Sequence, residues 1–153
     1  MTTLEVIGLD HIYLAVRDIE RSQAFYDRVM EPLGFKKSDF VIGGEPHAHY
    51  FNRVMQISLR PARSTAPHDS YAPGLHHLCL QVADNAAVDA AARMLESLGI
   101  AITAPATYPQ YAPDYYAVFF EDPDGLRFEL VARRSGRDEV VAKWERLEGF
   151  LIR

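Results

Sequence analysis

Two histidines, His11 and His77, stand at matching positions in two copies of one short sequence pattern. Residues 9–16 (LDHIYLAV) align with residues 75–82 (LHHLCLQV), with identical Leu, His, Leu and Val positions, and an Asp follows each copy two residues on. Chains that repeat a supersecondary unit bury the copies against each other. A ligand-type side chain at the same place in both copies is therefore expected to have a symmetry-related partner in one cavity.

Alternation along each strand assigns the faces on which these side chains lie. Side chains at every second position share a face, and Ile12, Leu14 and Val16 form an apolar face suited to packing against a helix. His11 then shares the opposite, concave face with Tyr13. The second copy agrees and places His77 on the same side. His76 has the wrong parity, and we interpret it as structural or partly exposed.

A carboxylate has matching parity in the last predicted strand. Phe128 and Leu130 belong to the helix side, which turns Arg127 and Glu129 toward the concave face. A carboxylate among apolar neighbours is costly to bury unless it is paired or hydrogen-bonded. In the corresponding strand of the first copy, Gln56 or Ser58 occupies the related position.

Two imidazoles and a carboxylate in one groove suit a divalent metal such as Zn, Ni, Mn, Fe or Co. A lone strand histidine is more often a core or surface residue than a ligand, but the repeat and the carboxylate favour a metal site. The remaining candidates, His47, His49 and His68, lack that support, and we interpret them as surface or pocket-rim residues.

The predicted elements follow the order β-α-β-β-β twice. Apolar periodicity, the capping residues Asp18 and Asp84, and turn residues at Gly43-Gly44 and 122–125 divide the chain. The predicted strands span 9–16, 35–42, 48–53, 54–60, 75–82, 100–103, 115–121 and 126–131, and the first helix ends at Met30.

These elements predict an α+β fold of two tandem βαβββ modules, which form a partly closed, mainly antiparallel sheet with helices on the outer face. We expect a single domain over residues 1–153, with module one at 7–61, a linker at 62–74 and module two at 75–133. A C-terminal helix over 138–151 places Val140, Val141, Trp144, Leu147 and Leu151 at helical intervals. We interpret it as packed on its own domain, with a dimer contact as the alternative.

Composition narrows the classes of function. The 153 residues are 48% hydrophobic and 24% charged, with a net charge of -5 and no dense run of Lys or Arg, which argues against nucleic-acid and anionic-membrane partners. No apolar run approaches the roughly 18 residues of a membrane span. The start of the chain lacks signal-peptide features, and a single cysteine fits a reducing compartment. We therefore predict a cytoplasmic protein.

The motifs together resemble the vicinal oxygen chelate superfamily, which includes glyoxalase I, fosfomycin-resistance proteins, extradiol dioxygenases and bleomycin-resistance proteins. The similarity spans roughly residues 7 to 133. The residues that carry it are Leu9-Asp10-His11-Ile12, Val16, Asp18, Phe25-Tyr26, Leu33-Gly34-Phe35, Gly74-Leu75-His76-His77, Phe120-Glu121-Asp122-Pro123-Asp124-Gly125 and Phe128-Glu129-Leu130.

The resemblance implies paired modules facing each other around a metal in a homodimer, with the modules of one site from one chain or from both. It maps the metal ligands onto His11, His77 and Glu129, and a fourth falls near Gln56, where a neutral amide replaces the usual Glu. Glu129 would then serve as ligand and base together, or another group assists. The pocket-lining candidates are Tyr13, Tyr115, Tyr116, His49 and Arg127, with sheet packing as the alternative for the tyrosines. Tyr116 is the best candidate for a catalytic hydrogen-bond donor to the substrate.

The resemblance favours a metal-dependent lyase or isomerase of glyoxalase type, acting on a small substrate that presents vicinal oxygens. No set of basic residues for the carboxylates of glutathione is evident. A fosfomycin-resistance-like enzyme would keep the three ligands, but Arg133, Arg134 and Arg137 are out of its pattern. Extradiol dioxygenases usually have four modules. A metal-free protein of bleomycin-resistance type, which sequesters a ligand, is the alternative from another class; such proteins lack the ligand set.

Overall fold

The computed structural model describes residues 4–146, and the chain divides into two compact units. Unit 1 comprises the residues up to Asp69 together with Asp122–Leu126, and unit 2 comprises Ser70–Glu121 and the residues from Arg127 onward. The boundary after Asp69 falls inside the predicted linker 62–74. The single domain over both modules stays a prediction.

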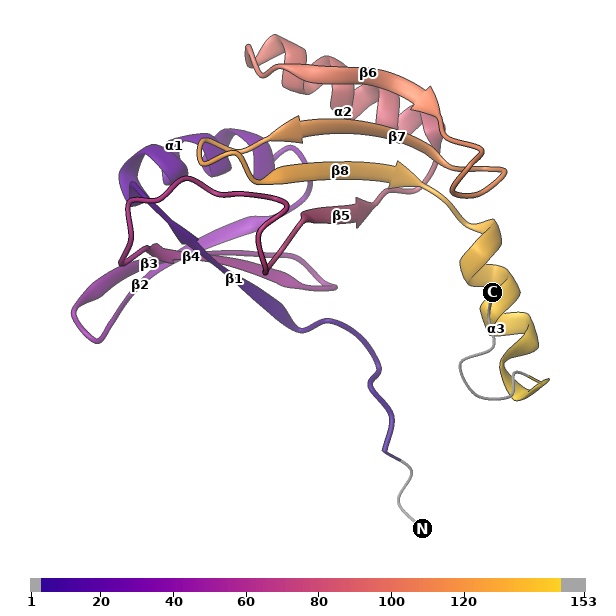
Figure 1. Ribbon diagram of the computed structural model, residues 1–153, viewed down its shortest axis with the longest axis horizontal. Helices are drawn as coiled ribbons and strands as arrows, with labels where there is room; N and C mark the ends of the chain where they lie inside the picture. Colours follow the sequence, from indigo (N-terminus) through magenta and orange to yellow (C-terminus); the bar gives the residue numbers. More distant parts are fainter. Residues whose placement is uncertain (1–3, 147–153) are drawn as a thin grey trace. The chain divides into compact units, whose positions relative to one another are not determined.

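Each unit contains one four-stranded mixed sheet and one helix of the repeat (Figure 1). The strand orders, β1-β4-β3-β2 and β5-β8-β7-β6, correspond under the repeat, and each sheet has one parallel and two antiparallel pairs. The predicted α+β fold of tandem βαβββ modules is confirmed. The elements are β1 His11–Val16, α1 Ile19–Met30, β2 Lys36–Ile42, β3 Glu45–Phe51, β4 Gln56–Pro61, β5 His77–Gln81, α2 Asn85–Ser97, β6 Ile102–Thr107, β7 Tyr116–Glu121, β8 Arg127–Ala132 and α3 Ser135–Lys143, followed by a 3-10 turn at Trp144–Arg146.

The two repeat helices begin and end in the same way. The Asp18 and Asp84 carboxylates each accept a hydrogen bond from the backbone N–H three residues on, at 3.0 and 2.9 Å, which satisfies a donor that the first helical turn leaves free. Gly34 and Gly99 follow the helices with positive φ angles of 85° and 74°. Both capping residues are as predicted.

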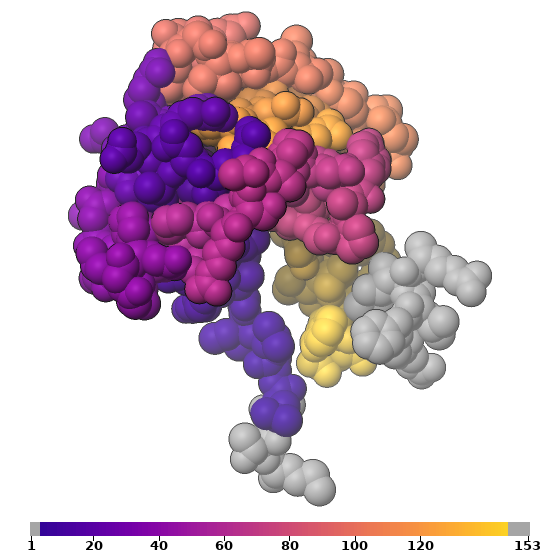
Figure 2. Space-filling view, turned by 60° about the vertical axis from the view of Figure 1, so that its left-hand side comes forward, coloured from indigo at the N-terminus to yellow at the C-terminus, as the bar shows by residue number. Residues whose placement is uncertain are grey.

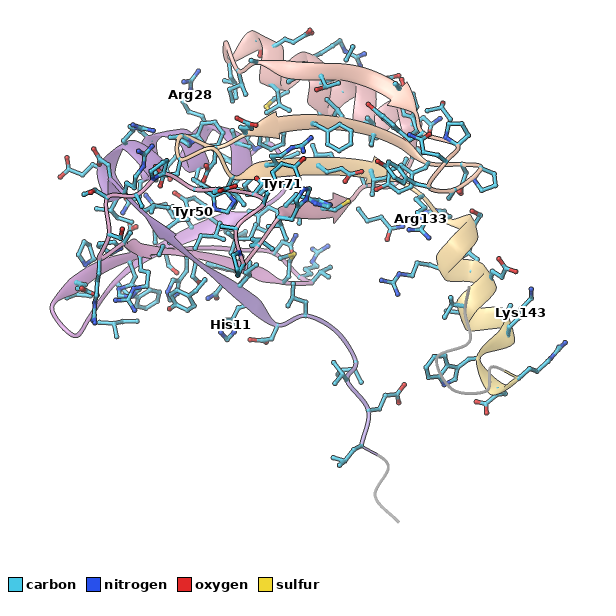
Figure 3. All side chains as sticks on the ribbon, in the orientation of Figure 1. His11, Arg28, Tyr50, Tyr71, Arg133 and Lys143 are labelled. Atoms are coloured by element: carbon cyan, nitrogen blue, oxygen red, sulfur yellow. The ribbon has the colours of Figure 1, made fainter. Side chains whose placement is uncertain are left out.

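One face of each sheet is buried under its helix. In β1, Leu14 and Val16 are buried while His11 and Tyr13 are exposed, and β5 alternates in the same sense. Tyr50, labelled in Figure 3, is 2% exposed, and its hydroxyl donates to Asp27 of α1 at 2.7 Å. The predicted faces are therefore correct.

Two strands differ from the prediction by three residues or more at one end, and the others agree within two residues. β3 begins at Glu45 rather than residue 48, because Gly43 and Gly44 both have positive φ and form a two-residue turn from which pairing starts at once. β6 continues to Thr107 rather than ending at residue 103. It contains Pro105, which an edge strand tolerates because its outer backbone groups need no ladder partner.

The C-terminal helix differs most from the prediction. α3 begins at Ser135 rather than residue 138, and none of its residues is buried. It extends away from the end of β8, in yellow in Figures 1 and 2. Packing on its own unit, as expected from Val140, Val141 and Trp144, is not found, and Leu147 and Leu151 lie outside the described residues. Of the helices within 4–146, none has the length and apolarity that crossing a bilayer requires.

The turn between β7 and β8 is a buried hydrogen-bonded structure that belongs to unit 1. One carboxylate oxygen of Asp122 accepts from the backbone N–H groups of Asp124 and Leu126, and the other accepts from the Tyr26 hydroxyl at 2.8 Å. Asp124 in turn holds the backbone and side chain of Arg17. Burial raises the pKa of Asp122, so these bonds offset a real cost of charge burial.

Replacing Asp122 by Ala should lower the free energy of unfolding by about 2–4 kcal/mol, because three buried donors lose their acceptor. Urea unfolding followed by circular dichroism measures the change. Asp138→Ala, at an exposed position of α3, serves as the control and should cost less than about 0.5 kcal/mol. Equal losses in the two variants would contradict the structural role of the turn.

Candidate active site

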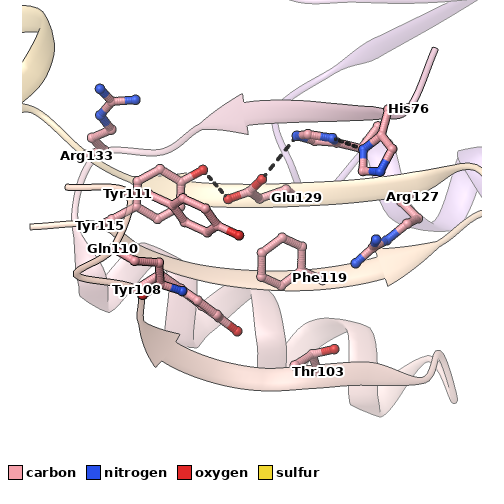
Figure 4. A pocket seen from close by; sticks show the side chains of 11 residues that line it. His76, Thr103, Tyr108, Gln110, Tyr111, Tyr115, Phe119, Arg127, Glu129 and Arg133 are labelled. Atoms are coloured by element: carbon pink, nitrogen blue, oxygen red, sulfur yellow. Dashed lines mark hydrogen bonds and ion pairs between the residues drawn. The ribbon is translucent and has the colours of Figure 1, made fainter. Parts of the chain in front are cut away.

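An open pocket of about 640 Å³ lies on the face of the second sheet opposite α2 (Figure 4). The side chains that line it come from β5 to β8 and from the loops before β5 and β7 and after β8, all within unit 2. They are His76, His77, Thr103, Tyr108, Gln110, Tyr111, Tyr115, Phe119, Arg127, Glu129 and Arg133. Four of the predicted residues therefore share one cavity: His77, Tyr115, Arg127 and Glu129.

Glu129 occupies the middle of this face and is only 2% exposed. Its Oε1 accepts a hydrogen bond from the Tyr115 hydroxyl at 2.5 Å, and its Oε2 lies 3.5 Å from His77 Nε2. Both oxygens of the buried carboxylate thus have a polar neighbour, as the cost of burying a charge requires. Burial and the Glu129 hydrogen bond raise the pKa of the Tyr115 hydroxyl, because the tyrosinate anion would be desolvated and would face the Glu129 carboxylate.

The residue before each repeat histidine holds the histidine ring. His11 Nδ1 lies 2.7 Å from an Asp10 carboxylate oxygen, and His77 Nδ1 lies 2.7 Å from His76 Nδ1. When Nδ1–H donates to such an acceptor, Nε2 keeps its lone pair for a ligand. His76, which we interpreted as structural from its parity, therefore contacts His77 inside the pocket.

In unit 1, the register between β1 and β4 settles which polar side chain corresponds to Glu129. Cys79 pairs with Glu129 in the second sheet, and the equivalent Tyr13 pairs with Ser58 in the first. Ser58, rather than Gln56, thus occupies the Glu129-related position, and it is fully buried. Gln56 pairs with His11, and its amide Nε2 donates to the Ser58 hydroxyl at 2.8 Å.

Tyr116, the predicted catalytic residue, points to the helix side of the sheet. Its hydroxyl donates to Asp89 of α2 at 2.8 Å, on the opposite face from the pocket. Tyr115, one residue earlier, contacts Glu129 instead. Tyr116 therefore does not line the pocket, whereas Tyr115, which was also predicted to line it, does. Tyr115 has the same parity as Phe119, the cross-strand partner of Glu129.

The other predicted pocket residues lie in unit 1. Tyr13 donates to or accepts from His49 Nε2 at 3.1 Å, and desolvation, with His47 and His11 nearby, lowers the pKa of His49. His47 is 4% exposed, so it is a buried residue rather than a surface one.

Sequence reasoning missed the tyrosine-rich end of the pocket. Tyr108 and Tyr111 lie in the loop between β6 and β7, and their rings stack with centroids 6.1 Å apart. No periodicity assigns a face to loop residues, so their place in the pocket follows from tertiary structure. The repeated aromatic spacing in Tyr108, Tyr111 and Tyr115 was the one available signal.

The sequence model of the Glyoxalase/Bleomycin resistance protein/Dioxygenase superfamily matches residues 8–130 of the chain. The chain belongs to this superfamily. The protein YqjT of Bacillus subtilis (strain 168), itself uncharacterised, is 30% identical over 126 residues, which cover 81% of this chain and 98% of YqjT. The resemblance inferred from the motifs is confirmed.

Solved structures of the superfamily have the same fold. A glyoxylase/bleomycin resistance protein/dioxygenase domain from Frankia sp. EAN1pec aligns with a TM-score of 0.71 and 25% identity over 85% of this chain and all of that one. The fosfomycin resistance protein FosX from Listeria monocytogenes aligns with a TM-score of 0.67 and 19% identity, over 88% of this chain and 98% of FosX. That structure contains Mn(II) and 1S,2S-dihydroxypropylphosphonic acid. At this identity the FosX likeness shows the fold alone.

Superfamily members commonly bind divalent metals, and unit 2 brings one imidazole and one carboxylate together, at His77 and Glu129. Imidazole nitrogen and carboxylate oxygen are suitable donors for Zn, Mn, Fe, Ni or Co. Among the described residues, neither unit by itself gathers three His, Cys, Asp or Glu side chains that could hold a metal ion.

Replacing Glu129 by Gln should lower the pKa of Tyr115, because a neutral amide opposes the tyrosinate charge less than a carboxylate does. NMR titration of protein labelled with ¹³C at the tyrosine Cζ atoms measures it. Tyr116, whose pKa is raised by its hydrogen bond to Asp89, is the internal control and should not change. A Tyr115 resonance that titrates identically in both proteins would disprove the coupling.

Proposed function

We propose that the chain is a divalent-metal-dependent enzyme of glyoxalase type, a lyase or isomerase whose small substrate chelates the ion through vicinal oxygens. The proposed protein ligands are His11, His77 and Glu129. Gln56 is the neutral candidate for a fourth position, through the amide oxygen that its bond to Ser58 leaves available.

The observation that carries this proposal is the matched arrangement of the two histidines. In each module the preceding residue, Asp10 or His76, lies 2.7 Å from Nδ1, and in each the Nε2 atom is the one left to face a ligand. A histidine that binds a metal commonly donates its other N–H to an acceptor, which fixes the tautomer and the ring orientation. Neither a buried structural histidine nor a surface histidine requires a polar neighbour at Nδ1 in both copies of the repeat.

The third proposed ligand, His11, determines whether one chain or two chains build the site. Since unit 2 supplies His77 and Glu129, His11 must reach them from unit 1 of the same chain or of a second chain. Membership of a superfamily that often forms dimers supports a homodimer, in which either arrangement places two imidazoles and one carboxylate around one ion.

The chain's own residues suggest how a substrate would be handled. A divalent ion supplies positive charge that stabilises an oxyanion on the substrate. Tyr115 holds Glu129 Oε1, which directs Oε2 toward His77 and the pocket, where it is placed to accept a proton from a substrate. Tyr115, whose one O–H is donated to Glu129, takes the role of positioning this carboxylate, and Tyr116 donates to Asp89 instead.

Metal content of the purified protein tests this proposal. The wild type should contain close to one ion per site and should melt at a higher temperature when the ion is added to the stripped protein. His11→Ala, His77→Ala and Glu129→Gln should each weaken metal binding by about 100-fold or more, as loss of a direct ligand does. His68→Ala, a histidine outside the pocket, is the matched control.

A purified wild-type protein that contains no metal, and whose melting temperature does not change when Ni, Zn, Mn or Fe is added, would contradict the proposed metal-dependent enzyme. It would favour the metal-free protein that sequesters a ligand.

His76→Phe should weaken metal binding by about 10- to 100-fold, because it removes the acceptor for His77 Nδ1–H and keeps a ring of similar size. His76→Asn, which retains an acceptor, should recover part of the affinity. Isothermal titration with Zn or Mn gives the affinities, and circular dichroism shows whether both variants fold. Wild-type affinity in His76→Phe would mean that His76 does not orient His77.

A further inference from the structure

We infer that the pocket of unit 2 takes an aromatic carboxylate, with stacked rings on its walls and Arg127 as the partner of the anion. The inference deepens the proposed function, since this ligand class would be that of the substrate whose oxygens reach the metal centre. Three properties of the pocket support it: the kind of apolar wall, the balance of charge, and the order in which the groups follow one another.

The apolar wall of the pocket is aromatic. Tyr108 stacks on Tyr111 and meets Phe119 edge-on, with centroids 5.4 Å apart at 88°, while Tyr111 and Tyr115 lie 5.2 Å apart. Among the described lining residues there is no Leu, Ile, Val or Met, and Thr103 supplies the one aliphatic methyl. Aromatic side chains favour offset-stacked and edge-to-face contacts with other rings, so this wall selects a planar aromatic body over a saturated one.

The charge of the lining is positive. Arg127 and Arg133 line the pocket, and Glu129 is the only carboxylate among the described residues that do so. Within residues 4–146, the Arg127 guanidinium makes no side-chain hydrogen bond or ion pair, and this includes Glu121, its cross-strand partner. Arg133 already lies over the Tyr115 ring, 5.8 Å from the centroid. A half-buried guanidinium without a partner is suited to a bidentate bond with a carboxylate.

The order of the groups fits one ligand. Figure 4 shows Arg127 at one end of the pocket and the tyrosines at the other, with Phe119 and Glu129 between them. Arg127 is also the register partner of His77 on the neighbouring strand. A ligand with its ring among the tyrosines and its carboxylate at Arg127 would therefore pass beside Glu129 and His77. A pocket of about 640 Å³ has room for such a molecule.

Three small probes test separately whether the ligand needs an aromatic ring and whether it needs a carboxylate charge. Benzoate has both the ring and the charge, cyclohexanecarboxylate has the charge alone, and benzamide has the ring alone. Binding is measured by ligand-observed NMR on protein stripped with a chelator, so that no metal contributes. Benzoate should bind about 3- to 10-fold more tightly than cyclohexanecarboxylate, as aromatic contacts predict, and about 10-fold or more tightly than benzamide.

Substitutions of residues that line the pocket test where benzoate binds. Arg127→Gln should weaken benzoate by about 10-fold or more and leave benzamide unchanged, whereas Arg127→Lys, which keeps the charge, should recover part of the loss. Tyr108→Leu should remove the preference for benzoate over cyclohexanecarboxylate. Arg93→Gln, on the exposed side of α2, is the matched control and should bind benzoate like the wild type. Circular dichroism confirms that each variant folds.

Equal binding of benzoate and cyclohexanecarboxylate, or benzoate binding that survives Arg127→Gln in full, would overturn the ligand class. A separate arm tests the metal centre: with Mn(II) present, 2-hydroxybenzoate, which has neighbouring oxygens, should bind more tightly than benzoate, and His77→Ala should abolish that difference alone. If the stripped protein selects benzoate as described but Mn(II) adds nothing, the ligand class is supported and the metal-dependent function fails.

Discussion

The candidate site depends on a carboxylate that is almost completely removed from water. Glu129 is 2% exposed on a sheet whose other face is packed against α2, so its charge is tolerable only because both oxygens have polar neighbours. Tyr115 takes one oxygen and His77 faces the other. These two contacts fix the orientation of the carboxylate, and the Glu129 hydrogen bond contributes to the raised pKa of Tyr115.

The two modules share one backbone arrangement but differ in the polar side chains at corresponding positions. Both modules have the same strand order, helix caps and Nδ1 contact to the repeat histidine, but the residue that makes this contact is Asp10 in one and His76 in the other. Where module two has Glu129, module one has a buried Ser58. The buried carboxylate at this position therefore belongs to unit 2, whereas in unit 1 Gln56 pairs with His11 and donates to Ser58.

Superfamily membership and the pocket answer different questions. The matched family spans glyoxalases, bleomycin-resistance proteins and dioxygenases, so membership shows the fold and leaves the reaction open. The lining of this pocket, by contrast, bears on which ligand can bind. The aromatic rings, the buried Glu129 carboxylate and an Arg127 guanidinium that has no partner within residues 4–146 would select among ligands through stacking, charge and donor geometry, which are properties of the side chains rather than of the fold.

The sequence by itself determined whatever depends on neighbours a few residues apart. Strand alternation put His11, His77 and Glu129 on the face opposite the helices, and short polar side chains capped α1 and α2, because these effects act within one turn or one pleat. Only the tertiary structure decided the contacts that join distant segments. It brought the loop residues Tyr108 and Tyr111 to the pocket wall and left α3 exposed. Such contacts depend on strand register and loop path, which no local pattern encodes.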